Sequence, residues 1–383
     1  MVAKKKKKIY DTVETMQKLY ETQDKPKKAF LVSIISGASG DEAACRELQG
    51  LCESLGLVIG AHEKVRVRER NPRFGIGSGK AEELSQKAKE LEADLMVFDW
   101  NPNPSQQRNW EELSELPVLD RQELIIRIFA ERASTREAEL QVKLAELTYF
   151  LPRLTHKYID LSRQRGGRYG TKGSGETKLE TDRRKIEKRI NLLEKEIEQV
   201  RKQRSQQRRQ RERSNIPVCA IVGYTNAGKS SLLNVLTGAD VLAQDKLFCT
   251  LDAVTRRFEP APSIPVLLTD TVGFIRSLPH SLIKAFHSTL EEAALADVLI
   301  HILDAADPAI EDNYKTTISV LKELKAHEIP MITLLNKIDC LPSGGESAIL
   351  EDLKNRFPES IAVSVKTGTA LDLLKEKIVS MVS

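Results

Sequence analysis

The 383-residue sequence has few of the features that mark secreted or membrane-spanning proteins. It contains five cysteines, an odd number, without a CxxC pair or a zinc-ligand spacing. No apolar run approaches the roughly 20 residues that cross a bilayer. The Lys4–Lys8 run is not followed by the apolar segment of a secretory signal. We therefore expect reduced thiols and a cytoplasmic monomer without stable membrane insertion. Peripheral association with a membrane stays open as an alternative.

Strong overall charge is also absent, because the net charge is only +4, but the charges are unevenly distributed. The stretch Arg183–Arg213 contains 13 Lys/Arg and 5 Asp/Glu. Such a block indicates either a solvated helix face or a surface that binds a polyanion, and the sequence alone leaves both open.

The length exceeds that of one ordinary domain, and the hydrophobic patterning changes twice along the chain. We predict an α/β multidomain protein with an N-terminal α/β domain, an antiparallel helical hairpin and a C-terminal Ras-like P-loop domain. The expected boundaries are a disordered basic tail at 1–28, the α/β domain at 29–135, the coiled-coil hairpin at 136–204, a linker at 205–216 and the nucleotide-binding domain at 217–383.

Short apolar runs alternate with helical patterns in the first domain, which is typical of a mainly parallel sheet. The predicted strands are Phe30–Ile35, Leu57–Val67, Leu95–Trp100 and Pro117–Asp120, and the predicted helices are Glu42–Leu55, Ala81–Leu91 and Ser105–Leu113. The segment Gly75–Lys80 resembles part of a phosphate loop. It lacks the distant first glycine and the Ser/Thr after lysine, so we favour a glycine turn before a helix over a second nucleotide site.

Two apolar seams of heptad type follow, and each would bury the other in an antiparallel hairpin. Pro152 lies inside the first seam and predicts a kink or break near Leu151. The seam residues are Leu140, Leu144, Leu147, Leu151, Leu154, Tyr158 and Leu161, then Leu179, Ile186, Ile190, Leu193, Ile197 and Val200.

The segment between the seams, residues 163–178, is rich in glycine and cations. Its cations are Arg163, Arg165, Arg168, Lys172 and Lys178. Glycines that expose backbone beside several cations favour a phosphate-contacting tip, so we predict that these five side chains contact a phosphate backbone. The alternative is a plain spacer with a solvated turn.

The segment GYTNAGKS fits the G-x-x-x-x-G-K-[ST] phosphate loop between an apolar strand and a helix. Its glycines let successive N–H groups point at phosphate, while Lys229 reaches the β- and γ-phosphates and the Ser230 hydroxyl ligates Mg²⁺. The predicted nucleotide contacts here are Gly223, Tyr224, Thr225, Asn226, Ala227, Gly228, Lys229, Ser230 and Ser231.

Three further segments complete a guanine-nucleotide site. The segment DTVG (Asp270, Thr271, Val272, Gly273) ends an apolar strand, where Asp270 suits Mg²⁺ through water and the Gly273 N–H suits the γ-phosphate. The segment NKID (Asn336, Lys337, Ile338, Asp339) sets the base, because its carboxylate accepts from N–H groups that adenine lacks, while Asn336 suits guanine O6/N7. The segment Ser364, Val365 and Lys366 resembles the last guanine loop, where the N–H of Val365 or Lys366 would meet O6.

The stretch between the phosphate loop and Asp270 is expected to contact the nucleotide through Phe248, Cys249, Thr250, Leu251 and Asp252. We expect Thr250 to complete the Mg²⁺ ligands beside Ser230 and Asp270, and we assign catalytic roles to Lys229, Thr250 and Gly273. A plain surface threonine is the alternative for Thr250.

These elements resemble the translation-factor-like GTPases. The segments Gly173–Arg184, Phe248–Asp252 and Asp270–Leu282, with several N-terminal ones such as Leu119–Arg121, resemble the HflX family of bacterial GTPases. The resemblance covers roughly Phe30 to the C-terminus. It implies an HflX-type N-terminal domain, binding of GTP and GDP, and binding to the large ribosomal subunit with dissociation of stalled ribosomes under stress.

One expected catalytic group is missing. Many GTPases place a glutamine after DxxG to orient water, whereas this chain has Phe274. We therefore expect slow hydrolysis that the ribosome stimulates. Asn226 is compatible with a K⁺-assisted site, although tolerance of the loop's backbone geometry explains it as well. Arg256 and Arg257 are candidates for an arginine finger in cis.

A second functional class also fits the sequence. In it, the chain is a non-switching RNA-binding or ribosome-assembly module that uses nucleotide mainly for stability.

Overall fold

The computed structural model describes residues 26–37, 41–164, 174–212, 216–240, 247–248, 251–276, 287–341 and 346–382. The basic tail before residue 26, most of the predicted tip and both Cys249 and Thr250 lie outside these residues. No helix of the described residues is long and apolar enough to cross a membrane.

The N-terminal domain is a four-stranded parallel sheet in the order β2-β1-β3-β4. The predicted strands and helices are confirmed, and one further helix, α5, follows the last strand. It begins after Asp120, whose buried carboxylate accepts the N–H of Glu123 as an N-cap. The elements are β1 (Lys28–Ile35), α2 (Asp41–Ser54), β2 (Val58–Arg66), α3 (Ser78–Glu90), β3 (Leu95–Phe98), α4 (Pro104–Ser114), β4 (Val118–Asp120) and α5 (Arg121–Arg132).

The glycine-rich segment before α3 forms the turn that the sequence favoured. Gly75 has a φ of +79°, and a Cβ there would lie 3.2 Å from the indole nitrogen of Trp100. Trp110 is fully buried and its ring meets that of Phe74 edge-on. The segment therefore closes the core of this domain.

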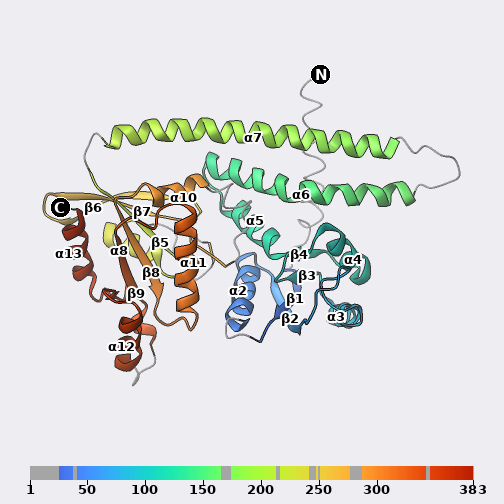
Figure 1. The fold of residues 1–383 in the computed structure, drawn as a ribbon, viewed down its shortest axis with the longest axis horizontal. Helices are drawn as coiled ribbons and strands as arrows, with labels where there is room; N and C mark the ends of the chain where they lie inside the picture. The colour runs from blue at the N-terminus through green and yellow to red at the C-terminus, as the bar shows by residue number, and fades with distance from the viewer. Residues whose placement is uncertain are drawn as a thin grey trace.

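The hairpin consists of α6 (Arg136–Gln164) and α7 (Ser174–Glu212), which lie side by side (Figure 1). The seams meet where their side chains are described: Leu140, Leu147, Ile186, Leu193 and Ile197 form one buried cluster. The predicted seam residues Leu154, Tyr158, Leu161 and Leu179 lie outside the residues whose side chains are described. Of the kink or break predicted near Leu151, the break is absent, because α6 continues through Pro152 while it packs against α7. A kink there remains a prediction.

The predicted helix end at residue 204 is wrong, because α7 continues through most of the predicted linker to Glu212. Arginine and glutamine are good helix formers, so the helix persists after its apolar seam ends. In the ribbon view α7 runs along the same side of both domains (Figure 1).

The C-terminal domain is a six-stranded sheet in the order β10-β9-β8-β5-β7-β6, with only the β6–β7 pair antiparallel. The α/β class predicted for this region is confirmed. Its elements are β5 (Val218–Gly223), α8 (Lys229–Thr237), β6 (Val254–Ala261), β7 (Ile264–Asp270), α10 (His287–Ala294), β8 (Val298–Asp304), α11 (Ile310–Glu323), β9 (Met331–Asn336), the 3₁₀ turn η1 (Ile338–Cys340), α12 (Glu346–Arg356), β10 (Ile361–Ala362) and α13 (Leu371–Val382).

One hydrophobic cluster joins the two domains. It contains Leu51 and Phe129 from the N-terminal domain and Phe248, Leu251 and Phe274 from the C-terminal domain, all nearly inaccessible to solvent. Burial of large apolar side chains on both sides makes the domain contact a shared core, which fixes how α2 faces the phosphate loop.

Candidate nucleotide-binding site

The phosphate loop leaves the end of β5, and its glycines are required by close contacts. Gly223 has a φ of +151°, and a Cβ there would lie 2.4 Å from the carbonyl oxygen of Ile302. Gly228 has a φ of +103°, and its Cβ would lie 2.4 Å from the Asn336 side-chain nitrogen. Any larger residue would therefore displace either β8 or the base-recognition segment.

Lys229 and Gly273 meet at the phosphate end of the loop. The buried Lys229 ammonium donates to the Tyr224 carbonyl at 2.8 Å. A Cβ on Gly273 would lie 2.9 Å from the Lys229 Nζ and equally close to Thr225. The DTVG segment thus lies directly against the phosphate loop, as a γ-phosphate sensor requires.

The predicted metal-binding side chains also converge. The Ser230 hydroxyl donates to Asp270 Oδ2 at 2.6 Å, and Asp270 is fully buried at the end of β7. A hydroxyl and a carboxylate are the hard oxygen donors that Mg²⁺ prefers, so these two residues fit the ion. The third predicted ligand, Thr250, lies outside the described residues.

The base-recognition residues are held by one another. Asp339 Oδ1 accepts from the Ser364 hydroxyl at 2.7 Å, and this hydrogen bond lowers the pKa of Asp339 below its usual value. The carboxylate therefore stays charged and able to accept from guanine. The Lys337 ammonium forms an ion pair with Asp304 at 2.7 Å, which fixes its stem beside the loop.

The Asn336 amide has a structural role that the sequence did not reveal. It donates to the Ala227 carbonyl at 2.9 Å and accepts from the Val365 N–H at 3.1 Å. It thereby joins the phosphate loop to the last guanine loop. Because the Val365 N–H is engaged, the Lys366 N–H is the better of the two predicted donors to guanine O6. Contact of Asn336 itself with the base remains a prediction.

The stretch after α8 faces the N-terminal domain. The Phe248 ring packs edge-on against that of Phe129, with centroids 4.7 Å apart. Asp252 accepts hydrogen bonds from the Ser134 hydroxyl at 2.7 Å and from the Thr135 side chain at the start of α6. These side chains are engaged with protein, so nucleotide contacts by Phe248, Leu251 and Asp252 would come from the backbone and stay predictions.

Phe274 has a structural role in the contact between the two domains. Its side chain is 1% exposed and lies in the shared core. Its backbone forms two hydrogen bonds with the phosphate loop, from the Thr225 N–H at 2.8 Å and to the Gly223 carbonyl at 3.1 Å. At the position where many GTPases have the water-orienting glutamine, this chain therefore has a buried side chain that packs between the two domains.

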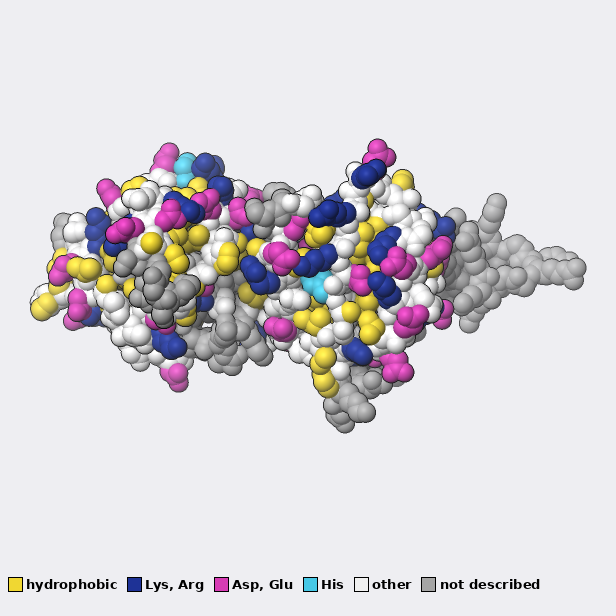
Figure 2. Space-filling model, turned by 90° about the horizontal axis from the view of Figure 1, so that it is seen from below, with side chains coloured by type: hydrophobic (Ala, Val, Ile, Leu, Met, Phe, Trp, Pro, Cys, Tyr) yellow, Lys and Arg dark blue, Asp and Glu magenta, His cyan; other side chains and the backbone are white. Residues whose placement is uncertain are grey.

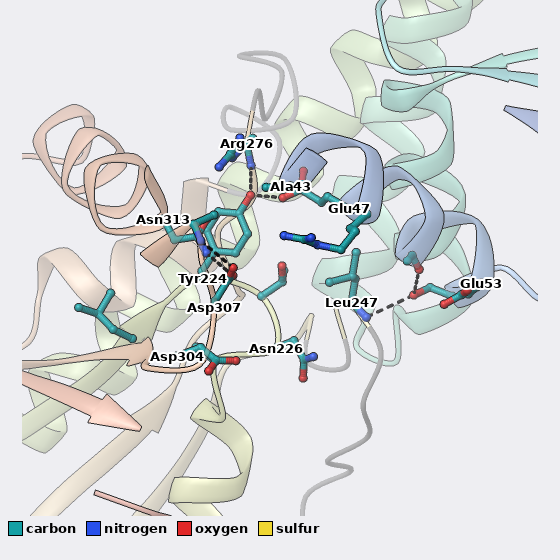
Figure 3. A pocket seen from close by; sticks show the side chains of 17 residues that line it. Ala43, Glu47, Glu53, Tyr224, Asn226, Leu247, Arg276, Asp304, Asp307 and Asn313 are labelled. Atoms are coloured by element: carbon teal, nitrogen blue, oxygen red, sulfur yellow. Dashed lines mark hydrogen bonds between the residues drawn. The ribbon is translucent and has the colours of Figure 1, made fainter. Parts of the chain in front are cut away.

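A polar network crosses the domain contact beside the phosphate loop (Figure 3). The Tyr224 hydroxyl contacts Glu47 of α2 and accepts from the Arg276 N–H at 2.9 Å. The buried Arg121 pairs with Glu47 and with Asp99 at 3.1 Å, and it donates to the Arg276 carbonyl at 3.3 Å. Desolvation raises the pKa of Tyr224 to about 12, so the phenol keeps its proton. Motif spacing gave no signal for this network.

Two other predictions have structural outcomes. Asn226 has a φ of +63°, so tolerance of the left-handed backbone accounts for its presence. Arg256 and Arg257 lie on the edge strand β6, exposed; Arg256 bonds the Thr255 carbonyl and Arg257 pairs with Glu259 at 2.9 Å. These local contacts do not favour either arginine as a finger.

His301, in β8 beside the phosphate loop, is fully buried and stacks on Tyr314 with centroids 5.4 Å apart. Burial, reinforced by the nearby Lys229 charge, lowers the pKa of His301 to about 3. The ring is therefore neutral at physiological pH.

Family models match three parts of the chain. The model described as GTP-binding GTPase N-terminal matches residues 42–130, GTP-binding GTPase Middle Region matches 132–211, and 50S ribosome-binding GTPase matches 218–337.

Curated relatives match almost the full length. A GTPase HflX of Akkermansia muciniphila is 45% identical over 91% of this chain and 83% of its own length. A GTPase HflX of Escherichia coli is 40% identical over 95% of this chain and 85% of its own length. A crystal structure of a GTP-binding protein from Sulfolobus solfataricus in complex with GDP is 26% identical and covers 93% of this chain and 98% of that one, with a TM-score of 0.47.

Proposed function

Because the chain belongs to the HflX family of GTPases and hydrolyses GTP, we propose that it is a GTP-controlled factor that binds the large ribosomal subunit and dissociates stalled ribosomes. The matching model for residues 218–337 is described as a 50S ribosome-binding GTPase, and this supports the choice of subunit. The proposal places the chain in the cytoplasm as a monomer, with rRNA as the surface that it contacts.

The placement of the hairpin carries the proposal. The described ends of α6 and α7 project past the N-terminal domain, on the side away from the C-terminal domain (Figure 1). The segment that joins them, with Arg165, Arg168 and Lys172, lies outside the described residues. Because the described helix ends lie beyond both domains, a phosphate backbone can approach them without a clash from either domain.

The charges elsewhere support the same assignment. On α7, Arg183 pairs with Glu187 at 2.9 Å and Arg184 with Glu180 at 2.6 Å, so this part of the cation-rich helix is a solvated face. Opposite the hairpin, basic and acidic side chains are interspersed (Figure 2). We therefore assign polyanion contact to the tip rather than to these surfaces.

The site residues have distinct roles in the reaction. Lys229 and the loop N–H groups bind the phosphates, and Ser230 and Asp270 would hold Mg²⁺, which offsets phosphate charge when it is bound. Gly273 reports the γ-phosphate through its N–H. Since Phe274 cannot orient water, we propose that the ribosome stimulates hydrolysis by ordering Thr250 and the DTVG segment.

Sedimentation of ribosomes with GTP, GDP or a non-hydrolysable GTP analogue tests the proposal. We expect the GTP analogue to hold the chain on large subunits and to shift intact ribosomes toward free subunits, while GDP does neither. Lys229→Ala should abolish both effects, because the loop loses its phosphate-binding cation. Equal splitting without nucleotide would instead support the non-switching RNA-binding or assembly module.

The tip is tested separately by replacing Arg163, Arg165, Arg168 and Lys172 with alanine. We expect weaker subunit binding and a shallower dependence of affinity on salt, with intrinsic GTP hydrolysis unchanged. The matched control replaces Arg183 and Arg184, which are paired on α7. A tip variant that binds subunits with the parental affinity and salt slope would refute the rRNA contact.

A further inference from the structure

The segment that joins α8 to β6 is anchored outside its own domain. Phe248 packs edge-on against Phe129 of α5, with ring centroids 4.7 Å apart. Leu251 is also buried in the core that both domains share. Thr250, the predicted third Mg²⁺ ligand, lies between these two anchors in the sequence. A displacement of the chain at position 250 therefore acts directly on the contact between the domains.

The end of the same segment is bound to the first residues of the hairpin. The Asp252 carboxylate accepts hydrogen bonds from the N–H and the hydroxyl of Ser134, at 3.2 and 2.7 Å. It also accepts from the Thr135 N–H at 3.2 Å and from the Thr135 hydroxyl. That hydroxyl in turn accepts the N–H of Ala138 at 3.2 Å, as an N-cap does. A carboxylate in this place also interacts favourably with the helix dipole, so Asp252 completes the cap of α6 from the other domain.

The first turn of α6 is firmly joined to α7. Arg136 pairs with Glu196 at 3.3 Å, directly after the residues that bind Asp252. One turn further along, Leu140 lies in the buried cluster that contains Leu193 and Ile197 of α7. A shift of α6 against α7 would expose this apolar surface to water. The two helices therefore move together when the start of α6 moves.

The hairpin is joined equally firmly to the N-terminal domain. Arg153 of α6 pairs at 2.9 Å with Asp120, whose carboxylate is fully buried and also accepts from the Tyr149 hydroxyl at 2.9 Å. The Arg153 guanidinium lies 3.7 Å from the centroid of the Tyr149 ring. Separating a buried carboxylate from its cation is costly. The hairpin and the N-terminal domain therefore form one body against the C-terminal domain.

A second contact joins α7 to the C-terminal domain. Arg201 of α7 pairs with Glu291 of α10 at 3.8 Å, and α10 is the first described helix after DTVG. A partly exposed pair at this distance contributes little energy, but it shows that α7 lies beside α10. The long helix passes along both domains (Figure 1). The hairpin thus borders the segment of Thr250 and the helix that follows DTVG.

We propose that Asp252 is a positioning residue that couples the nucleotide site to the hairpin. Through its bonds to Ser134 and Thr135, a change at position 250 on GTP binding reaches the first turn of α6. The hairpin and the N-terminal domain then change their orientation against the C-terminal domain with the bound nucleotide. This inference rests on the GTP switch of the proposed function, but not on contact with the ribosome.

The short connection between Thr250 and Asp252 makes the coupling direct. The two residues are two positions apart, so the chain between their Cα atoms spans at most about 7 Å. Mg²⁺ needs its oxygen ligands at about 2.0–2.1 Å in near-octahedral geometry, so ligation of the ion fixes position 250 closely. Hydrogen bonds from helix N–H groups to a carboxylate are stronger than neutral ones. The start of α6 therefore follows Asp252 and keeps its cap.

Energy transfer between two fluorophores on the full-length chain, without ribosomes, tests the coupling. The fluorophores are attached to non-natural amino acids in place of Lys188 on α7 and Asn355 on α12, which are both exposed. We expect the transfer efficiency of the parent to differ between saturating GDP and a saturating non-hydrolysable GTP analogue with Mg²⁺. Asp252→Ala should lose this difference, because the nucleotide site no longer holds α6.

Variants on the hairpin side separate coupling from other effects of residue 252. Combining Ser134→Ala with Thr135→Val leaves Asp252 in place and should also abolish the difference, whereas Thr135→Ser keeps the hydroxyl and should retain it. The control for simple loss of a helix cap is Asn103→Ala. Asn103 caps α4 by accepting the Gln106 N–H at 2.8 Å, so its variant loses a cap but should keep the parental difference. Titration with each nucleotide establishes saturation for every variant.

Two results would overturn the coupling. In one, the parent has the same transfer efficiency with GDP and with the GTP analogue, so that the hairpin does not respond to the nucleotide. In the other, the combined Ser134→Ala and Thr135→Val variant keeps the parental difference, so that the response takes another route. A failure of the ribosomal proposal has a different signature, because subunit binding would be absent in sedimentation while the nucleotide-dependent difference persists.

Discussion

Replacing Phe274 with glutamine tests whether the missing water-orienting residue can simply be restored. The Phe274 side chain is 1% exposed in the core that joins the two domains, beside Phe248 and Leu251. Its backbone is bonded to Thr225 and Gly223 of the phosphate loop, so the side-chain direction is fixed. A glutamine there would point into the core and away from the nucleotide.

The expected loss of stability follows from the burial of the Phe274 side chain. Loss of a fully buried phenylalanine forfeits roughly 2–3 kcal/mol of transfer free energy. An amide buried without a partner adds about 1–3 kcal/mol. We therefore expect Phe274→Gln to lower the free energy of unfolding by roughly 3–6 kcal/mol, against about 1–1.5 kcal/mol for the apolar control Phe274→Leu.

Urea unfolding followed by far-UV circular dichroism measures the stability, and single-turnover hydrolysis measures the rate. We expect Phe274→Gln to unfold at a clearly lower urea concentration than Phe274→Leu, with no gain in hydrolysis by the folded fraction. A glutamine variant as stable as the parent that hydrolyses GTP ten or more times faster would refute the reasoning. It would mean that residue 274 turns freely toward the nucleotide.

Three further predictions concern the site. The pKa of His301 is about 3 in the folded chain and near 6.5 in the unfolded chain. As the pH falls, protons therefore bind the unfolded state first, and the free energy of unfolding decreases between about pH 6.5 and pH 3. The free energy of unfolding should be about 2 kcal/mol lower at pH 5. The urea midpoint of His301→Phe should not show this decrease with pH. If the parent and His301→Phe had the same dependence of urea midpoint on pH, His301 would not be the group responsible. Asp339→Asn should weaken GTP binding by at least about 10²-fold and admit a xanthine nucleotide, whose 2-oxo group accepts from the new amide, as competition binding would show. The left-handed backbone of Asn226 accounts for an asparagine at this position without a bound K⁺. The rates of GTP hydrolysis in KCl and in NaCl should therefore agree within about twofold. A much faster rate in KCl would instead establish a K⁺ site.

The phosphate loop, DTVG and NKID could be read from the sequence because each motif is local. Each segment follows a buried parallel strand, and the carboxyl ends of such strands meet at one edge of a sheet. The convergence of Ser230 with Asp270 and of Asp339 with Ser364 was therefore predictable. The heptad seams likewise determined the hairpin, since each apolar face needs the other for burial.

The helix ends at the hairpin were less predictable. The apolar pattern marks where the two helices pack, but α7 continues to Glu212 through residues of high helix propensity. Similarly, packing against α7 keeps α6 intact through Pro152, which sequence rules treat as a breaker. In both cases the sequence contains a local signal for a helix end, namely the end of the apolar seam in α7 and Pro152 in α6. Helix propensity outweighs this signal in α7, and packing against α7 outweighs it in α6.

Only the tertiary structure decided how the N-terminal domain meets the nucleotide site. No spacing relates Glu47 to Tyr224, or Asp252 to the start of α6, because these contacts join residues more than a hundred positions apart. The sequence by itself determined a guanine-nucleotide site without a water-orienting glutamine. The tertiary structure added that Phe274 is buried between the domains and that Glu47 of α2 contacts Tyr224 of the phosphate loop. Neither could be predicted, because the way in which the two domains pack together decides which side chains meet between them.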